Sequence, residues 1–187
     1  MTEDADVPSD EHLVQQTLAG DDGAFAMLAR RYRARIAGMA ARFASDSHEA
    51  DDLIQEIFLR VWRKLRQFRG VVPFEHWLLR LATRQCYDLL RRRYRRREET
   101  LDPEHWDRLA DLSTRTEDAQ AAREFLDLAL RRLKPEERLV ITLLELEEHS
   151  VRETSRLTGW SEASVKVRAF RARKKLKTIL EQLDESR

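Results

Sequence analysis

Arginine is concentrated in one stretch of the sequence, and its spacing there suits the binding of phosphate groups. Residues 80–97 hold eight arginines and a single acidic residue. Because an α-helix turns by about 100° per residue, one narrow stripe collects four of them: Arg80, Arg84, Arg91 and Arg95. A row of guanidinium groups on one helix face can bind the backbone of a nucleic acid. A single basic run is more often a solvated face, so the interpretation needs a second basic element.

The second basic element lies near the end of the chain. Residues 164–177 hold seven lysines or arginines and no acidic residue. They follow a capping-box sequence, Ser150-Val-Arg-Glu153, and a turn that contains Gly159, after which Ser161 is placed to cap the next helix. Two short helices joined by such a turn are typical of a helix-turn-helix, whose second helix enters the major groove of DNA. Two basic helices, one in each half of the chain, favour nucleic-acid binding.

The helix predicted to begin after Ser161 has two distinct faces. One face is apolar and should pack on its domain: Val165, Ala169, Ala172, Leu176 and Ile179. The opposite face offers Ala163, Ser164, Val167, Phe170, Arg171 and Lys174. On this face the two cations can meet phosphates or guanine edges, and the apolar side chains can touch thymine methyl groups. The alternative is a basic amphipathic helix that only packs on a partner, with cations that favour the helix C-terminus.

Trp77 lies on the seam between the arginine stripe and an apolar face of the same predicted helix. That apolar face contains Phe74, Leu78, Leu81, Ala82 and Leu89. Trp77 is therefore either a core residue or a surface on which bases stack beside the arginines. The preceding loop, Arg69-Gly-Val-Val-Pro-Phe74, can cradle a base that has been extruded from a duplex.

Apolar residues recur at spacings of three and four between the glycines and prolines, which predicts an all-α protein of two small helical domains. We expect helices at about 11–18, from 22, and at 49–68, 73–97, 119–133, 135–148, 151–157 and 162–183. Residues 98–118 contain eight acids, two arginines and Pro103, which indicates an acidic linker. The predicted domains are residues 10–97 and 119–183, and the second carries the helix-turn-helix.

The sequence offers little for covalent chemistry or metal binding. There is one cysteine, Cys86, and the five histidines are scattered. No glycine-rich phosphate loop or catalytic serine motif occurs. We therefore expect a protein that is not an enzyme and that has no cofactor and no metal. The acidic start of the chain and the lack of an apolar run of about 18 residues predict a cytoplasmic protein without membrane insertion.

Three groups of residues together resemble one known family. The stretch Ala50-Asp-Asp-Leu-Ile-Gln-Glu-Ile-Phe-Leu-Arg-Val-Trp62 is similar to region 2.2 of the extracytoplasmic-function (ECF, group 4) sigma factors of bacterial RNA polymerase, which belong to the sigma-70 family. Residues 68–70, 74–83 and 88–92 resemble regions 2.3 and 2.4, and residues 133–138 and 161–176 resemble region 4. The resemblance covers about residues 10–97 and 119–180.

This resemblance implies an alternative sigma factor that binds core RNA polymerase and directs promoter-specific transcription initiation. Polymerase binding falls on Asp52, Gln55, Glu56 and Leu59. Recognition and melting of the promoter −10 element fall on Arg69, Phe74, Trp77, Arg80, Arg84 and Arg91. Recognition of the −35 element falls on Ser161, Ser164, Lys166, Val167, Arg168, Phe170, Arg171 and Lys174. An anti-sigma factor is a further implied partner, and the acidic linker would replace region 3.

The chain departs from the family pattern at several positions. Arg84 stands where the family commonly has Asn, and Val167 stands where Ser is common. Thr154 and Ser155 replace an Ile-Ala pair in the first helix of the motif. Trp160 replaces a smaller aliphatic residue and can fill the space that this pair leaves. We therefore expect a promoter preference that differs from that of other members.

Two other functions stay open on the residues alone. A helix-turn-helix regulator that acts as a dimer on duplex DNA would share the C-terminal motif, but it gives no reason for the acidic helix at 50–62. A protein-interaction module would use its basic helices to dock an acidic partner. Binding through phosphate contacts weakens as the salt concentration rises, whereas the binding of such a module to DNA would not. Residues 45–56, with five acids and no Lys or Arg, fit either a basic partner surface or a solvated face.

Overall fold

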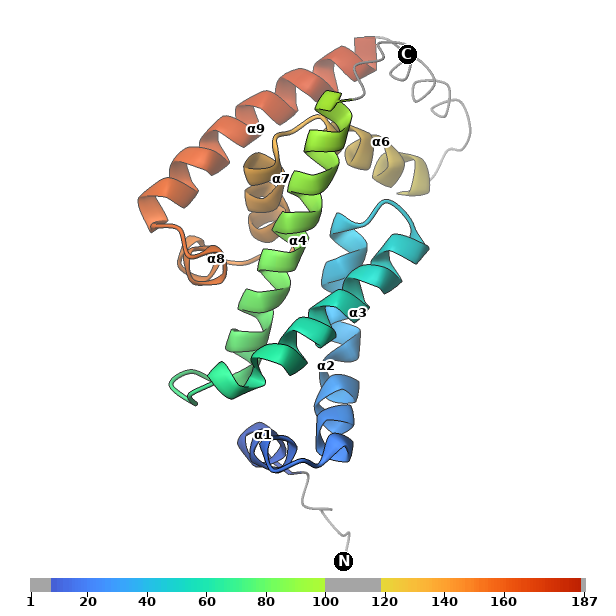
Figure 1. Ribbon diagram of the computed structural model, residues 1–187. Helices are drawn as coiled ribbons and strands as arrows, with labels where there is room; N and C mark the ends of the chain where they lie inside the picture. Colours follow the sequence, from blue (N-terminus) through green and yellow to red (C-terminus); the bar gives the residue numbers. More distant parts are fainter. Residues whose placement is uncertain (1–7, 100–118, 186–187) are drawn as a thin grey trace, which may run out of the picture. The chain divides into compact units, whose positions relative to one another are not determined.

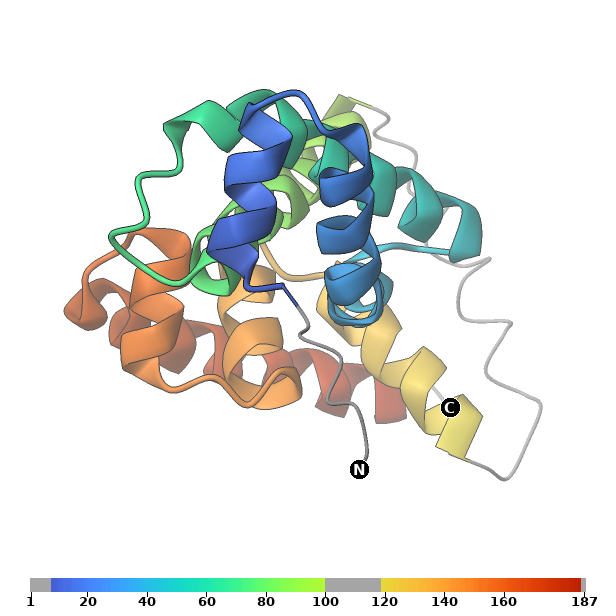
Figure 2. The ribbon, with the colours of Figure 1, turned by 90° about the horizontal axis from the view of Figure 1, so that it is seen from below.

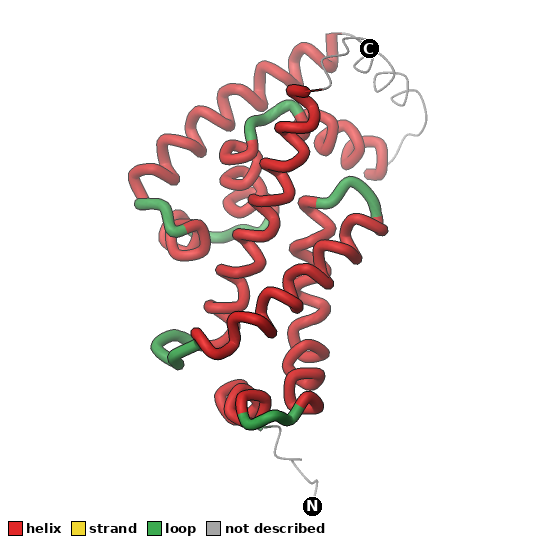
Figure 3. The backbone as a smooth tube through the Cα atoms, viewed as in Figure 1, coloured by secondary structure: helices red, strands yellow, loops and turns green. Residues whose placement is uncertain are grey.

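The computed structural model describes residues 8–99 and 119–185, and all regular secondary structure in these ranges is helical (Figures 1 and 3). The predicted all-α fold is therefore confirmed. The chain divides into two units, Met1–Cys86 and Tyr87–Arg187, and the boundary falls inside the long helix α4 (Phe74–Glu99). The predicted linker at 98–118 lies almost wholly outside the described residues. The units are described one at a time below.

The first unit contains α1 (Asp10–Leu18), α2 (Asp22–Phe43), α3 (Ser47–Lys64), the short 3₁₀ helix η1 (Leu65–Gln67) and the first half of α4. Side-chain caps set the helix starts, because Ser9, Asp21 and Asp46 each accept hydrogen bonds from backbone N–H groups in the next turn. α1 packs beside α2 (Figure 2). The core collects apolar side chains at helical spacing: Leu13, Leu28, Ile36, Phe43, Leu53, Ile57, Val61, Leu78 and Ala82.

Asp10 ties α1 to α2. Its carboxylate accepts hydrogen bonds from Arg31 and from the hydroxyl of Tyr32. Burial, together with the hydrogen bond and the charge of Asp10, raises the pKa of Tyr32, so the phenol stays protonated and keeps donating. Two hydrogen bonds to one carboxylate thus fix the crossing of these helices.

Two predicted helix boundaries in the first unit differ from the structure. α3 ends at Lys64 and continues as the 3₁₀ turn η1, so the predicted helix over 49–68 is shorter, and Phe68 lies beyond it in extended backbone. Pro73 does not occupy the first turn of α4. Its carbonyl instead accepts the N–H of Trp77 at 3.3 Å, which makes Pro73 the residue that precedes the helix.

The second unit contains α6 (Ala119–Arg131), α7 (Pro135–Ile141), the π-helical turn η3 (Thr142–Leu146), α8 (Val151–Thr158) and α9 (Glu162–Glu185), with the second half of α4. α7 packs in two directions, because Ile141 belongs to one apolar cluster and Val140 to another. α9 supplies Ala172 and Ile179 to the first cluster and Val165 and Ala169 to the second. The apolar run Leu139-Val-Ile141 lets the C-terminal half of α7 pack in both directions, while Glu136 and Glu137 stay half-buried.

The predicted α-helix over 135–148 is only half correct. Beyond Ile141 the backbone widens into a π-helical turn, in which the N–H of Glu147 bonds the carbonyl of Thr142 at 2.9 Å. Glu148 then adopts φ 55°, and the N–H of His149 bonds the carbonyl of Leu143 at 2.9 Å. These bonds turn the chain so that Ser150 can cap α8. Apolar periodicity gives no sign of such a change in backbone winding.

Candidate nucleic-acid and polymerase interfaces

The helix-turn-helix forms as predicted. At the start of α8, the N–H of Glu153 donates to Ser150 Oγ at 3.2 Å, and Glu153 Oε2 accepts from the N–H of Ser150 at 2.8 Å. Gly159 ends α8 with φ 77°, a left-handed conformation that favours glycine. Ser161 Oγ then accepts the N–H of Ser164 at 3.2 Å and caps α9. These local bonds fix the turn between the two helices.

The capping box also changes the pKa of Glu153. Hydrogen bonds from the side chain and backbone of Ser150 lower the pKa of Glu153, because both stabilise the ionised carboxylate. Glu153 is therefore charged at neutral pH, in the first turn of α8, where the helix dipole favours an anion.

α9 shows the two faces that its sequence predicts. Val165, Ala169, Ala172 and Ile179 are buried in the second unit. On the opposite face Phe170 is 70% exposed and Val167 is 49% exposed, and Ala163, Arg171 and Lys174 are exposed beside them. Apolar and cationic side chains thus share one outward face, a composition that suits base-edge recognition in the major groove.

The structure separates the seven cations of residues 164–177 into three groups. Ion pairs hold Arg173 to Glu145 at 2.6 Å, Lys175 to Glu137 at 3.2 Å and Lys177 to Glu181 at 3.8 Å. Arg168 lies over the ring of Trp160. The remaining three make no side-chain hydrogen bond or ion pair with any described residue: Lys166, Arg171 and Lys174. These three are the cations that stay available for a polyanion.

Two further cations are on α8 and were not among the sequence candidates. Arg152 and Arg156 are one turn apart and exposed. In helix-turn-helix proteins the first helix crosses the DNA backbone while the second enters the groove. The i, i+4 spacing of two arginines on a predicted first helix was the signal that could have identified them.

In the first unit, the loop before α4 rests on a cluster of aromatic rings. Phe74 packs against Phe68 with ring centroids 5.6 Å apart and against Tyr32 at 5.7 Å. Trp77 lies 5.4 Å from Phe68 and 5.9 Å from Phe74 and is half-buried. Trp77 therefore packs partly on this cluster and leaves another part exposed, and its stacking role stays a prediction.

Phe74 requires a correction. Its side chain is only 1% exposed, so it does not present a surface to −10 DNA, as the sequence had suggested. The exposed apolar residues belong to the loop itself, where Val71 is 85% exposed and Val72 is also exposed. Gly70 has φ 69°, which allows the loop to turn sharply before these two valines. Phe74 anchors the loop, and the valines form its tip.

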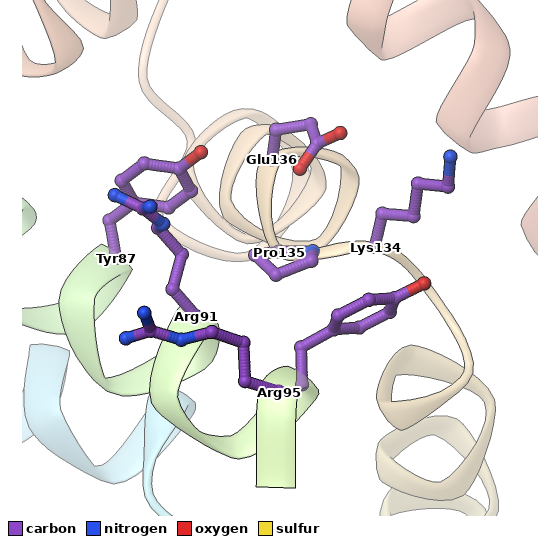
Figure 4. A pocket seen from close by; sticks show the side chains of 7 residues that line it. Tyr87, Arg91, Arg95, Lys134, Pro135 and Glu136 are labelled. Carbon is purple, nitrogen blue, oxygen red and sulfur yellow. The ribbon is translucent and has the colours of Figure 1, made fainter. Parts of the chain in front are cut away.

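The arginine stripe is present on α4. Arg80, Arg84, Arg91 and Arg95 are all exposed, and so is Arg69 in the loop. Figure 4 shows Arg91 and Arg95, one helical turn apart, with extended side chains that project from α4. The apolar face of the same helix is buried at Leu78, Ala82 and Leu89. Arg69, Trp77 and Arg80 thus lie in the loop and the first two turns of α4, whereas Arg84 and Arg91 lie further along the helix.

The polymerase-binding candidates lie on the outward face of α3. Asp52, Gln55 and Leu59 are exposed, and Glu56 is half-buried. Trp62, one turn beyond Leu59, is 42% exposed and packs edge-on against Phe25 of α2 with ring centroids 4.7 Å apart. Trp62 was not a sequence candidate. An exposed tryptophan beside an exposed leucine extends the acidic face of α3 into an apolar patch, a combination that is frequent at protein interfaces.

Within residues 8–99 and 119–185, no group of three or more His, Cys, Asp or Glu side chains could hold a metal ion. No helix in the same ranges is long and apolar enough to span a bilayer.

Comparison with known proteins gives the same pattern over both halves of the chain. A family model described as Sigma-70 region 2 matches residues 28–96, and one described as Sigma-70, region 4 matches residues 123–176. The ECF RNA polymerase sigma factor SigM of Mycobacterium tuberculosis is 32% identical over 172 residues, which cover 92% of this chain and 85% of SigM. The ECF sigma-E factor of Haemophilus influenzae is 30% identical over 185 residues, covering 94% and 97%.

Solved structures show the same fold. CnrH, solved in complex with the cytosolic domain of CnrY, matches with a TM-score of 0.62 at 28% identity and covers 94% of this chain and 99% of CnrH. RpoE of Bartonella quintana, solved with the anti-sigma factor NepR, matches with a TM-score of 0.54 at 20% identity, over 79% and 90% of the two chains.

The helical fold, the helix-turn-helix and these matches define a sigma factor of the sigma-70 family. Within that family the chain belongs to the ECF group. It is therefore an alternative sigma factor, which acts with core RNA polymerase to direct promoter-specific transcription initiation.

Proposed function

We propose that α9 reads the promoter −35 element and that its outward face carries the sequence preference. The observation that supports this most is the pairing of exposed apolar and unpaired cationic side chains on one face: Val167, Phe170, Arg171 and Lys174. Arg171 can bind a guanine edge, and Val167 and Phe170 can contact thymine methyl groups. Arg152 and Arg156 of α8 bind the flanking phosphates.

The first unit has a different task in this proposal. The loop at 69–73 captures a base flipped out of the −10 element against the exposed valines and the outer part of Trp77, and the α4 arginines bind the adjacent phosphates. Extruding a base costs a few kcal/mol of stacking and pairing. Stacking on an aromatic side chain returns about 1–3 kcal/mol per base. Stacking and the phosphate contacts of the α4 arginines together offset the cost of extrusion, so the bound state favours melted DNA. The protein then opens the strands by binding alone, with no covalent chemistry.

The outward face of α3 binds core RNA polymerase. Asp52 and Gln55 supply charge and polarity, and Leu59 and Trp62 supply the apolar centre. Acidic residues on this face suit a basic surface of the polymerase, since complementary charges speed encounter and fix orientation. Because core polymerase is where the protein acts, we place it in the bacterial cytoplasm.

An anti-sigma factor is the remaining partner in the proposal. RpoE of Bartonella quintana was solved with the anti-sigma factor NepR, and CnrH was solved with the cytosolic domain of CnrY. We propose that such a protein covers the α3 and α4 surfaces and so competes with both polymerase and promoter.

Binding to purified core RNA polymerase tests the assignment of α3 as the polymerase-binding surface. Asp52→Arg and Leu59→Ser should weaken association with core enzyme, measured by fluorescence anisotropy of labelled full-length protein. Glu11→Arg, which alters an exposed acid of α1, is the matched control and should leave affinity unchanged. Equal affinity for all four proteins would remove α3 from the interface.

A second arm tests the DNA surfaces in the assembled holoenzyme. Arg171→Ala should reduce transcription from a natural duplex promoter and have little effect on a template whose −10 region is already unpaired and which lacks a −35 element. Val71→Ser with Val72→Ser should also lose activity on the duplex promoter, but it should recover on a template that keeps the −35 element and has an unpaired −10 region, because premelting removes the step that the loop assists. Loss of activity on every template would contradict the assignment of separate tasks.

A further inference from the structure

Arg168 is held differently from the other cations of α9. Its Cζ lies 4.4 Å from the centroid of the Trp160 ring, well within the range of a cation–π interaction. Its guanidinium also donates to the carbonyl of Ser164 at 3.3 Å and to the hydroxyl of Ser164. The side chain is half-buried, whereas Lys166, Arg171 and Lys174 are exposed. Arg168 is thus turned back toward the start of α9, and part of its hydrogen-bonding capacity is already used.

Trp160 is itself tied into the turn between α8 and α9. Ser155 Oγ donates to the carbonyl of Trp160 at 2.6 Å, and the N–H of Trp160 donates to Thr158 Oγ1 at 3.2 Å. The indole packs against the buried cluster of Val140, Val165 and Ala169. Trp160 therefore connects α8, the turn and the core, and its ring supplies a fixed surface for Arg168.

We propose that Arg168 is a positioning residue, which locks the second turn of α9 onto Trp160 and so sets the angle of the recognition helix relative to α8. It is not a phosphate ligand, although it lies in the basic segment and was predicted to contact the −35 element. Phe170 and Arg171 follow directly on the same helix, and their reach into the groove depends on its angle. Displacements of about 0.5 Å are enough to weaken a specific contact.

The proposal rests on the proposed −35 function of α9, and salt dependence tests it. The probe is a duplex selected from a random pool with the wild-type full-length chain, and its affinity is measured across a range of KCl concentrations. Arg168→Ala should lower the affinity about threefold to tenfold and leave the slope of log K against log[KCl] unchanged. Lys166→Ala, the matched control on the exposed face, should flatten that slope by roughly 0.9, the value for one phosphate contact.

A double-mutant comparison gives a second, independent readout. In a Trp160→Leu background, which keeps an apolar side chain but removes the ring, Arg168→Ala should cause little further loss. Arg171→Ala should cause the same loss in both backgrounds, because it acts on DNA directly. Circular dichroism and urea unfolding check that Trp160→Leu is folded. Trp160→Tyr, which keeps a ring, should restore the effect of Arg168→Ala.

The outcomes distinguish an error in the positioning role of Arg168 from an error in the −35 role of α9. If Arg168→Ala flattens the salt slope by about one phosphate contact and adds fully to Trp160→Leu, Arg168 is a DNA ligand and the positioning role is wrong. The slope from the single Arg168→Ala variant decides this even where Trp160→Leu does not fold. If Arg171→Ala leaves the affinity for the selected duplex unchanged, the assignment of α9 to the −35 element is wrong.

Discussion

α4 and α9 are both long basic helices, but they expose different side chains. The outward stripe of α4 carries arginines, and the apolar residues near it are buried or belong to the preceding loop, as at Val71 and Val72. α9 carries its exposed apolar residues, Val167 and Phe170, on the helix itself. In the first unit the apolar contact surface therefore sits on a loop, and in the second it sits on a rigid helix.

This difference matches two kinds of DNA recognition. A helix fits the major groove of an intact duplex and reads base edges at fixed spacing, so its apolar groups must be held on the helix. A base that has left the stack has no fixed position, and a loop tip can close around it. The anchoring of the loop by Phe74 and the locking of α9 by Trp160 are then two solutions to one problem, which is to hold exposed apolar groups in place.

Two phenylalanines give the largest expected contrast. Phe74→Ala should lower the free energy of unfolding by about 3–5 kcal/mol, because it empties the centre of a buried aromatic cluster. Phe170→Ala should change stability by less than about 0.5 kcal/mol, since its ring is mostly exposed, yet it should weaken −35 binding. Urea unfolding and duplex titration of both variants check this. Comparable destabilisation by both would show that Phe170 packs in the folded protein.

Arginine substitutions compare the two helices directly. Arg171→Ala should weaken binding by roughly 1–3 kcal/mol on the preferred −35 sequence and relax selectivity at one base pair. Arg80→Ala should weaken binding to all sequences alike and reduce the salt slope by about one contact. Titration of matched and mutated duplexes by each variant provides the measurement. A sequence-dependent loss for Arg80→Ala would mean that α4 also reads bases.

The cap of α8 predicts a smaller effect on stability. Ser150→Ala removes the acceptor for the N–H of Glu153 and should cost about 0.5–2 kcal/mol of unfolding free energy at pH 7. Thermal unfolding followed by circular dichroism measures it. Ser161→Ala, the corresponding change at the start of α9, serves as the comparison and should cost a similar amount.

Glu153 adds a pH dependence to this cap. Because the folded pKa of Glu153 is lowered from 4.5, its contribution to stability is fully present above that value and is lost as the pH falls through the folded pKa. At neutral pH the free energy of unfolding should be higher for the wild-type protein than for Glu153→Gln. This difference should shrink as the pH falls, and the two values should converge in strongly acidic solution. Unfolding curves of both proteins from pH 7 downward test this, and a constant difference would contradict it.

The smallest effect is expected for a paired cation. Arg173→Ala breaks an exposed ion pair with Glu145 and should change stability by about 0–1 kcal/mol. It should leave the salt slope of −35 binding unchanged, whereas Lys174→Ala, its exposed neighbour, should flatten it. Equal slopes for the two variants would mean that the Glu145 pair opens when DNA binds.

Several features of the fold follow from local sequence. The capping box at Ser150 and Glu153, the turn at Gly159 and the buried face of α9 all form as predicted, because they depend on caps and spacings within one segment of the chain. Nothing in the sequence singled out Trp62, and the spacing of Arg152 and Arg156 did not by itself show that they are exposed. Their exposure depends on which neighbouring helix covers which face.

Local chemistry along the chain determined where the helices lie, which side of each is apolar, and which segments are basic. Tertiary structure alone decided which of those basic side chains are available. Glu145 and Glu137 neutralise cations 28 and 38 residues away, and Trp160 engages Arg168 across a turn. Periodicity orders residues around one helix axis, but the partners of Arg173 and Lys175 come from other elements, so only the packed fold reveals them.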